Sequence, residues 1–165
     1  MMHSNILFLV RKVFPLIPDS RGYRFKRFLL RLGGVNVARN VRVCSSVKII
    51  GDRNLSIGEN TFIGHDTIII CSSDVCIGSI VNIAPRCYIG TGSHVIDLMG
   101  CSIAGKGKSE PIIIGNGAWL CASSTIIAGS VIGEMSIIAA GAVVKGKVRS
   151  RTMVGGVLAK EIKSY

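Results

Sequence analysis

The residues best suited to acid–base chemistry are a histidine and an aspartate at the point where a regular sequence pattern stops. His94 follows Gly92-Ser93, and Asp97 comes three residues later. An imidazole accepts a proton near neutral pH, so His94 is a candidate general base that activates a hydroxyl group. Asp97 is a candidate to orient or charge-balance that imidazole, or to bind an acceptor. The alternative for both residues is an exposed position in a turn.

A second polar pair, His65 and Asp66, lies in an earlier segment of the pattern and is a candidate for acceptor contact from a turn. The remaining histidine, His3, has no assigned role. No two histidines lie close in the sequence and no two cysteines have a metal-binding spacing, so we expect no metal. The six cysteines are expected to be small, reduced, buried hydrophobic residues.

The elements that must position these residues follow from a six-residue repeat. Between 114 and 144 every sixth residue is aliphatic, and the fifth slot is mostly Ala or Ser. The aliphatic members are Ile114, Leu120, Ile126, Ile132, Ile138 and Val144. The phrase recurs over 57–94, and a weaker version opens at Val35. A period of six matches neither an amphipathic helix nor an ordinary hairpin, and it predicts short stacked strands that bury a column of aliphatic side chains.

Composition limits the possible fold classes, and the spacing of the repeats gives the domain boundaries. The chain has 165 residues, 24 of them Ile and 16 Val, which excludes a disordered chain and argues against a helical bundle. No apolar run is long enough to cross a membrane. With three repeats in each triangular coil, the pattern predicts about five coils over 35–148, interrupted by an extruded loop at 95–111. Residues 1–34 precede the repeats, and 149–165 form a C-terminal tail.

The segment from Ile83 to Val144 resembles the hexapeptide-repeat acyltransferases, in particular the branch of sugar and surface-polysaccharide O-acetyltransferases. The arrangement of His94, the following loop and the phrase Ile114-Gly-Asn-Gly-Ala-Trp119 is the most specific part. This resemblance implies an all-β, left-handed parallel β-helix and a homotrimer with sites between subunits. It also implies transfer of an acetyl group from acetyl-CoA to a sugar hydroxyl, with His94 as the base and the loop covering the acceptor.

The same resemblance suggests where the donor lies. In the family, small residues contact the pantetheine arm through their backbone, a tryptophan stands near the donor or packs at a subunit contact, and lysines lie near the nucleotide. The matching positions here are Ala122, Ala140, Gly141, Trp119, Lys145 and Lys160. The C-terminal phrase departs from the usual Gly-Asn-Pro-Ala-Lys: it reads Gly155-Gly-Val-Leu-Ala-Lys160, which retains only the Gly and the terminal Ala-Lys.

The positive charge is concentrated at the N-terminus. Residues 1–53 contain 11 basic and two acidic residues, which gives 11 − 2 = +9 of the total +11. We expect two short helices, from about Ile6 to Phe14 and from about Asp19 to Leu32, with apolar and basic faces. They either cap the first coil or contact another subunit, or they rest on anionic lipid. Nucleic acid is not an expected partner, because no recognised module is present. The expected location is the cytoplasm, with peripheral contact at the inner membrane.

Three alternative functions remain open. A serine O-acetyltransferase shares the repeat but usually carries a larger helical N-terminal domain. A sugar N-acetyltransferase differs only in the acceptor atom. A non-catalytic hexapeptide-repeat subunit of an assembly belongs to another class, and it would have no need of His94.

Overall fold

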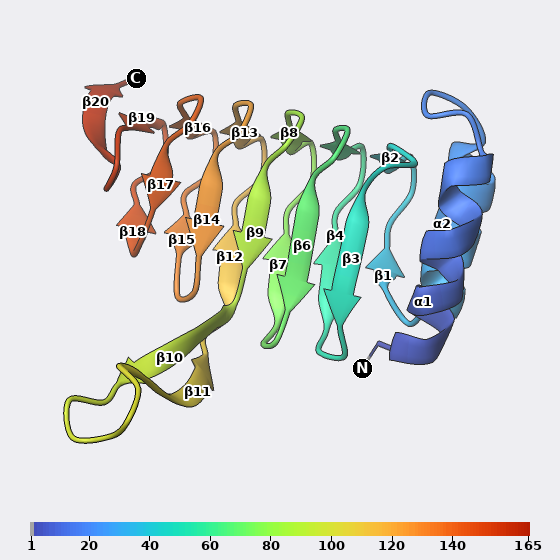
Figure 1. Cartoon of the computed structure of the whole chain (residues 1–165). Helices are drawn as coiled ribbons and strands as arrows, with labels where there is room; N and C mark the ends of the chain where they lie inside the picture. Colours follow the sequence, from blue (N-terminus) through green and yellow to red (C-terminus); the bar gives the residue numbers. More distant parts are fainter. Residues whose placement is uncertain (1) are drawn as a thin grey trace.

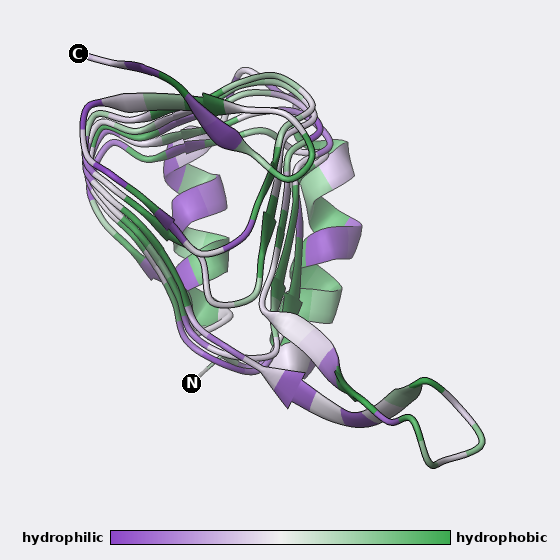
Figure 2. Ribbon diagram, turned by 90° about the vertical axis from the view of Figure 1, so that its left-hand side faces the viewer, coloured by the Kyte–Doolittle hydropathy of each residue, from purple (hydrophilic) through white to green (hydrophobic). Residues whose placement is uncertain are grey.

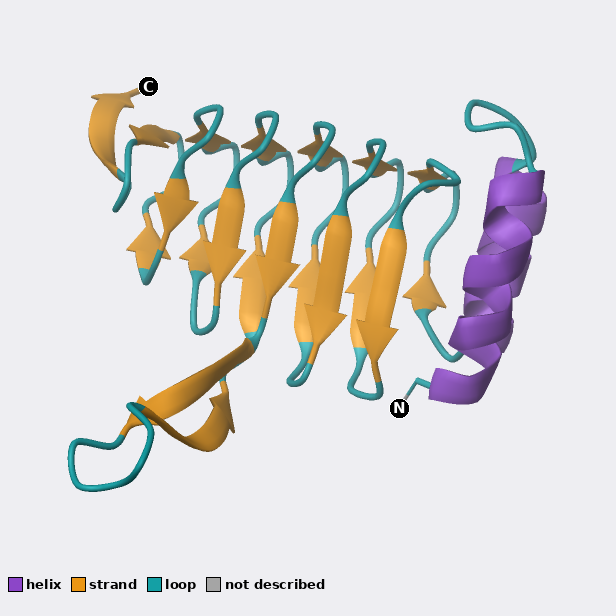
Figure 3. Cartoon of the chain, viewed as in Figure 1, coloured by secondary structure: helices purple, strands orange, loops and turns teal. Residues whose placement is uncertain are grey.

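The chain folds into a left-handed parallel β-helix closed at one end by two helices (Figures 1 and 3). The structure is a computed structural model and describes residues 2–165. Each coil passes through three parallel sheets in turn, and the coils stack along one axis, which confirms the predicted β-helix. Viewed along that axis, the stacked coils form a prism, and a long hairpin leaves one of its corners (Figure 2).

The three sheets are named here in the order in which the chain visits them. Sheet 1 consists of β1 (Asn36–Val37), β4 (Leu55–Ile57), β7 (Val75–Ile77), β12 (Ile112–Ile114), β15 (Val131–Ile132) and β18 (Lys147–Val148). Sheet 2 consists of β2 (Arg42–Val43), β5 (Phe62–Ile63), β8 (Asn82–Ile83), β13 (Trp119–Leu120), β16 (Ile137–Ile138), β19 (Thr152–Gly155) and the antiparallel β20 (Lys160–Ser164). Sheet 3 consists of β3 (Lys48–Gly51), β6 (Ile68–Cys71), β9 (Tyr88–Gly90), β14 (Thr125–Ile127) and β17 (Val143–Val144).

The six-residue repeat produces the core directly. All six aliphatic residues named for 114–144 are at most 2% exposed. They align in columns because the coils stack in register, as where Ile83 pairs with Leu120 and Leu120 with Ile138. The small fifth-slot residues are fully buried at the turns, and the Ser136 hydroxyl donates to the Gly133 carbonyl at 2.6 Å. A larger side chain at these turns would meet the neighbouring coil.

The β-helix has a sixth coil where the sequence pattern suggested about five. Sheets 1 and 2 each contain six parallel strands, the last being β18 and β19. Val148 and Val154 continue the core there, at 8% and 6% exposure. Part of the segment expected to be a C-terminal tail therefore stacks on the fifth coil, because inward aliphatic residues resume there, four residues after Val144 at Val148 and six residues later at Val154.

The break in the repeat forms a projecting β-hairpin rather than an irregular loop. Its strands are β10 (Gly92–Ile96) and β11 (Ala104–Ser109), which pair antiparallel with a register shift between His94 and Ile96. Nearly every residue of both strands is exposed. The hairpin leaves the edge where each coil turns from sheet 3 to sheet 1 (Figure 1), called here the 3–1 edge.

The N-terminal segment forms α1 (Ser4–Val13), the short helix η1 (Phe14–Leu16) and α2 (Tyr23–Leu32). The second helix begins four residues later than expected, because Gly22 adopts a left-handed φ of 65°. The apolar and basic residues of this helix are not separated onto two faces as the sequence pattern suggested. Lys26 is fully buried and donates to the carbonyls of Pro18 and Asp19, whereas Phe28 and Leu32 are half exposed.

Burial of the cysteines is only partly as predicted. Cys44, Cys71 and Cys87 are buried, but Cys76 and Cys101 are exposed, on the outer side of β7 and in the hairpin. All six are free thiols. Among residues 2–165, neither helix has the length and apolar character that a bilayer crossing requires.

Candidate functional site

The hairpin fixes the orientation and tautomer of the His94 imidazole. Its Nδ1 lies 2.9 Å from the carbonyl oxygen of Gly105 on the facing strand. A carbonyl oxygen only accepts hydrogen bonds, so Nδ1 carries the proton in the neutral ring. The lone pair is therefore on Nε2. This is the arrangement that a histidine needs to accept a proton from a substrate.

His94 borders a groove of about 440 Å³ at the base of the hairpin. The residues around it are Ser72, Gly92, Ser93, His94, Gly107, Lys108 and Ser109. Of these, only His94 was predicted as a site residue. Ser72 had a detectable signal, because it lies at the same edge one coil of 20 residues before Gly92. Lys108 lines the same groove and forms an ion pair with Glu110 at 3.3 Å.

The carbonyl that holds His94 is itself fixed by close packing. A Cβ atom added to Gly105 would lie 3.0 Å from the Val95 carbonyl oxygen and 2.7 Å from the Asp97 Cβ. A side chain there would push the two strands apart. Gly107, two residues further along the same strand, has no atom within 4 Å of the equivalent position. Gly105, but not Gly107, is therefore required for the local strand geometry.

Asp97 is not brought onto the imidazole. Its Oδ1 accepts hydrogen bonds from the backbone amides of Met99 and Gly100, at 3.0 and 2.9 Å. This is a local turn in which the aspartate bonds to the chain just ahead of it. The structure thus gives Asp97 a part in shaping the hairpin tip, and the orienting partner of His94 is the Gly105 carbonyl.

His65 and Asp66 lie outside the His94 groove, at the edge where each coil turns from sheet 2 to sheet 3, called here the 2–3 edge. His65 Nδ1 lies 3.4 Å from Asp19 Oδ2, and the Asp66 amide donates to the Ser46 hydroxyl. They stand beside the N-terminal helices rather than beside His94. Sequence reasoning could not separate these edges, because both lie at turns of the same repeat.

Asp19, Cys44 and His65 present one potential metal ligand each within 4.8 Å of one another. The local chemistry opposes a cation. The Asp19 carboxylate already accepts from the amides of Ser45 and Ser46, and the buried Lys26 ammonium lies 2.8 Å from the Asp19 carbonyl. Burial, followed by the Asp19 charge, raises the pKa of the Cys44 thiol and favours its neutral form.

The residues suggested for the donor gather at the 2–3 edge of the later coils. Ala122 lies after β13, and Ala140 and Gly141 lie after β16. The turns stack directly, since the Gly141 amide donates to the Ala122 carbonyl at 3.0 Å. Gly141 has a φ of 69°, and no atom lies within 4 Å of the position that a Cβ would occupy, so its backbone is open to a thin ligand.

The other predicted donor residues are spread over the C-terminal half. Trp119 is half exposed on sheet 2, between Asn82 and Ile137 in register. Lys145 is exposed at the 3–1 edge, the edge that carries His94, and Lys160 is exposed at the start of β20. One copy of the chain therefore keeps His94 and the small-residue turns on two different edges of the prism.

Comparison with known proteins supports this interpretation of the fold. No family model matches the chain. It is 31% identical over 118 residues to WcaF of Escherichia coli K12, named as a proposed acetyltransferase of colanic acid biosynthesis. The match covers 72% of this chain and 63% of WcaF, so the chain spans less than two thirds of that relative. The galactoside O-acetyltransferase of the same organism is 30% identical, over 67% of this chain and 54% of its own length.

The solved structures agree with the β-helix. A hexapeptide-repeat acetyltransferase from Vibrio cholerae, solved with acetyl-coenzyme A, superimposes with a TM-score of 0.77 at 23% identity and covers 98% of this chain and 86% of its own. A galactoside acetyltransferase solved with coenzyme A gives a TM-score of 0.78 at 22% identity, covering 98% and 80%. The repeat, the coil geometry and the sequence relatives agree: the chain belongs to the hexapeptide-repeat acetyltransferases.

Proposed function

We propose that the protein transfers an acetyl group from acetyl-CoA to a sugar hydroxyl, with His94 as general base. The observation that carries the proposal is the hydrogen bond from His94 Nδ1 to the Gly105 carbonyl, which leaves Nε2 free beside a groove. The names of the sequence relatives, which include a galactoside O-acetyltransferase, support the choice of a sugar acceptor and an acetyl donor.

The reaction needs only one base. As the sugar oxygen attacks the thioester carbonyl, Nε2 of His94 accepts the hydroxyl proton. The new C–O bond forms, the tetrahedral intermediate collapses, and the C–S bond breaks. The imidazolium then returns its proton to the departing thiolate, which leaves as coenzyme A. Backbone amides near the groove stabilise the oxyanion. No acetylated enzyme is formed.

A second copy of the chain completes the site in this proposal. His94 stands on the 3–1 edge, whereas Ala122, Ala140 and Gly141 stand on the 2–3 edge. Packing three β-helices around a common axis brings one edge of each against a different edge of its neighbour. A homotrimer therefore pairs the base of one subunit with the donor wall of the next, and an isolated subunit is inactive.

The acceptor we favour is a sugar of a surface polysaccharide precursor, and the location we favour is the cytoplasm. Two relatives are named for polysaccharide or lipopolysaccharide biosynthesis, which supports the first point. The second follows from the proposed donor, since acetyl-CoA is a cytoplasmic metabolite.

A thiol-release assay tests the proposal. The purified protein is incubated with acetyl-CoA and, separately, with nucleotide sugars, free sugars, serine and lipid-linked glycans. We expect release above the acceptor-free background with a sugar, and an O-acetyl ester in the product by mass spectrometry. Release with serine or with an amino sugar alone would favour one of the other transferases. Release with none of them, or unchanged release in His94→Asn, would contradict the proposal.

A further inference from the structure

The N-terminal end of the β-helix carries an apolar and cationic surface that the acetyl transfer does not use. Its apolar members belong to α1, η1 and α2 and are 39–82% exposed: Ile6, Phe8, Leu9, Leu16, Phe25, Phe28 and Leu32. The inner side chains Leu7, Val10 and Leu30 already close the first coil. The exposed side chains are therefore not needed for the cap that α1 and α2 form over the end of the β-helix (Figure 1).

The two helices have the side-chain distribution of interfacial helices. Along α2, the residues Phe25, Phe28 and Leu32 follow at spacings of three and four, which places them on one flank. The Phe25 and Phe28 rings stack with centroids 6.4 Å apart. Arg24 and Arg31 lie beside this flank; Arg24 is exposed, and the Arg31 guanidinium donates to the Val37 and Ala38 carbonyls. An apolar flank beside a basic flank is typical of helices that lie in the plane of a bilayer surface.

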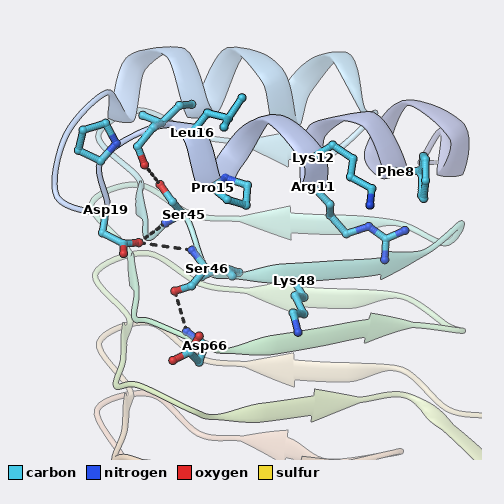
Figure 4. Close-up of a pocket in the computed structure, with 13 residues that line it drawn as sticks. Phe8, Arg11, Lys12, Pro15, Leu16, Asp19, Ser45, Ser46, Lys48 and Asp66 are labelled. Atoms are coloured by element: carbon cyan, nitrogen blue, oxygen red, sulfur yellow. Dashed lines mark hydrogen bonds between the residues drawn. The ribbon is translucent and has the colours of Figure 1, made fainter.

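A groove of about 900 Å³ opens between α1 and β3, next to this surface (Figure 4). Phe8, Pro15 and Leu16 form its helical wall, and Ser45 to Lys48 form the opposite wall. Arg11 and Lys12 extend from the helix toward the strand that carries Lys48 (Figure 4). The groove thus combines an apolar wall with three cations.

These cations lack acidic partners. Within the described chain, none of Arg11, Lys12 and Lys48 forms an ion pair, and Arg11 Nε is buried without a hydrogen-bond partner. Of the two carboxylates in the groove, Asp19 is already bonded to the amides of Ser45 and Ser46. The net positive charge that remains is complementary to phosphate.

We infer that this end of the molecule docks on a bilayer that contains anionic phospholipid. The outward apolar residues of α1 and α2 enter the interfacial region, and a lipid phosphate binds between Lys12 and Lys48 in the groove beside α1. In the proposed trimer the three N-terminal ends point the same way along the common axis, so the three surfaces bind together. The inference concerns a surface separate from the His94 groove, and its test does not depend on the reaction.

The test is co-sedimentation of the full chain with vesicles of phosphatidylcholine alone or with one quarter phosphatidylglycerol. We expect binding to the mixed vesicles and a marked decrease at high salt. Lys12→Gln/Lys48→Gln removes two positive charges from each subunit. Each lost charge should weaken the membrane binding of that subunit by roughly five-fold. The matched control is Lys147→Gln/Lys163→Gln, two exposed lysines at the opposite end, and it should bind as the unmodified protein does.

A second pair of double variants distinguishes insertion of apolar side chains into the bilayer from electrostatic attraction to it. Leu9→Ser/Leu16→Ser should also reduce vesicle binding, whereas Leu98→Ser/Met99→Ser at the exposed hairpin tip should not. Unchanged melting temperatures show that each variant is folded. Equal sedimentation of wild type with both vesicles, equal loss in the hairpin control, or self-association through Leu9 and Leu16 without vesicle binding would overturn the inference.

Discussion

Different interactions determine the structure of the coils and of the hairpin at 92–109, although one continuous stretch of chain forms both. In the coils, burial determines which amino acid can occupy a position: Ile83, Leu120 and Ile138 stack in register and are fully buried. In the hairpin almost every side chain is exposed, and hydrogen-bond geometry determines which amino acid is needed, as at His94 and Gly105. The coils therefore hold the stabilising core, whereas the proposed base stands on a hairpin that buries almost nothing. Variants of the hairpin should leave the stability of the coils unaffected.

The largest expected effect is on catalysis, from His94→Asn. Asparagine can still donate to the Gly105 carbonyl, but it has no basic nitrogen to accept the substrate proton. We expect a decrease in kcat of about 10²–10⁴-fold, measured by thiol release, with no change in melting temperature. A folded variant that keeps wild-type turnover would show that the hairpin does not supply the base.

The largest effect on stability should come from the coils. Leu120→Ala leaves a cavity in the middle of the stack and should lower the free energy of unfolding by about 2–5 kcal/mol, as measured by chemical denaturation. Val95→Ala removes methyl groups from a half-exposed hairpin residue and should change it by less than about 0.5 kcal/mol. Equal losses would mean that the hairpin is part of the folding core.

A smaller effect, confined to catalysis, is expected from Gly105→Ala. The added Cβ meets the Val95 carbonyl oxygen, displaces β11 and moves the acceptor of the His94 hydrogen bond. We expect roughly a ten-fold decrease in kcat from misorientation of the base. Gly107→Ala, on the same strand with no neighbouring atom, is the matched control. Similar activity in both variants would remove Gly105 from the positioning of His94.

The smallest effect concerns thiol reactivity. Burial raises the pKa of Cys71 to about 12 and also raises the pKa of Cys44, Cys87 and Cys121. These thiols stay protonated at pH 8, while the exposed Cys76 and Cys101 remain accessible. A thiol reagent should label two of the six cysteines rapidly in the native protein and the rest on unfolding. Rapid labelling of four or more would contradict the packing of the coils.

The fold could be predicted because a six-residue period leaves few alternatives. Each inward aliphatic residue has one slot, and Leu120 or Ile126 could be placed in the core from spacing alone. The sixth coil was missed because Val148 and Val154 belong to a segment where the small turn residues change. The burial of Lys26 was missed because helical periodicity does not reveal that the backbone carbonyls of Pro18 and Asp19 lie within its reach.

The site could be predicted only in part. His94 stood out because it interrupts the repeat. Its hydrogen-bond partner could not be found, since a backbone carbonyl has no sequence signature and the pairing of β10 with β11 depends on a register shift. Asp97 was the natural candidate by spacing, yet its carboxylate turns toward the amides of Met99 and Gly100. Which edge each turn occupies depends on the coil length, which is 20 residues in the earlier coils, 18 from the fourth to the fifth and 16 from the fifth to the sixth.

The most direct test of the account asks whether the two edges act across subunits. His94→Asn carries a defective base edge, and Ala140→Tyr should block the small-residue edge. Each variant alone should be inactive. In trimers assembled from equal amounts of the two variants, a site is intact only where a subunit with native His94 lies against a subunit with native Ala140. Random assembly gives this arrangement at one site in four, so about one quarter of the wild-type thiol release should return. Mixed trimers that stay inactive, while both variants remain folded and assembled, would contradict the account.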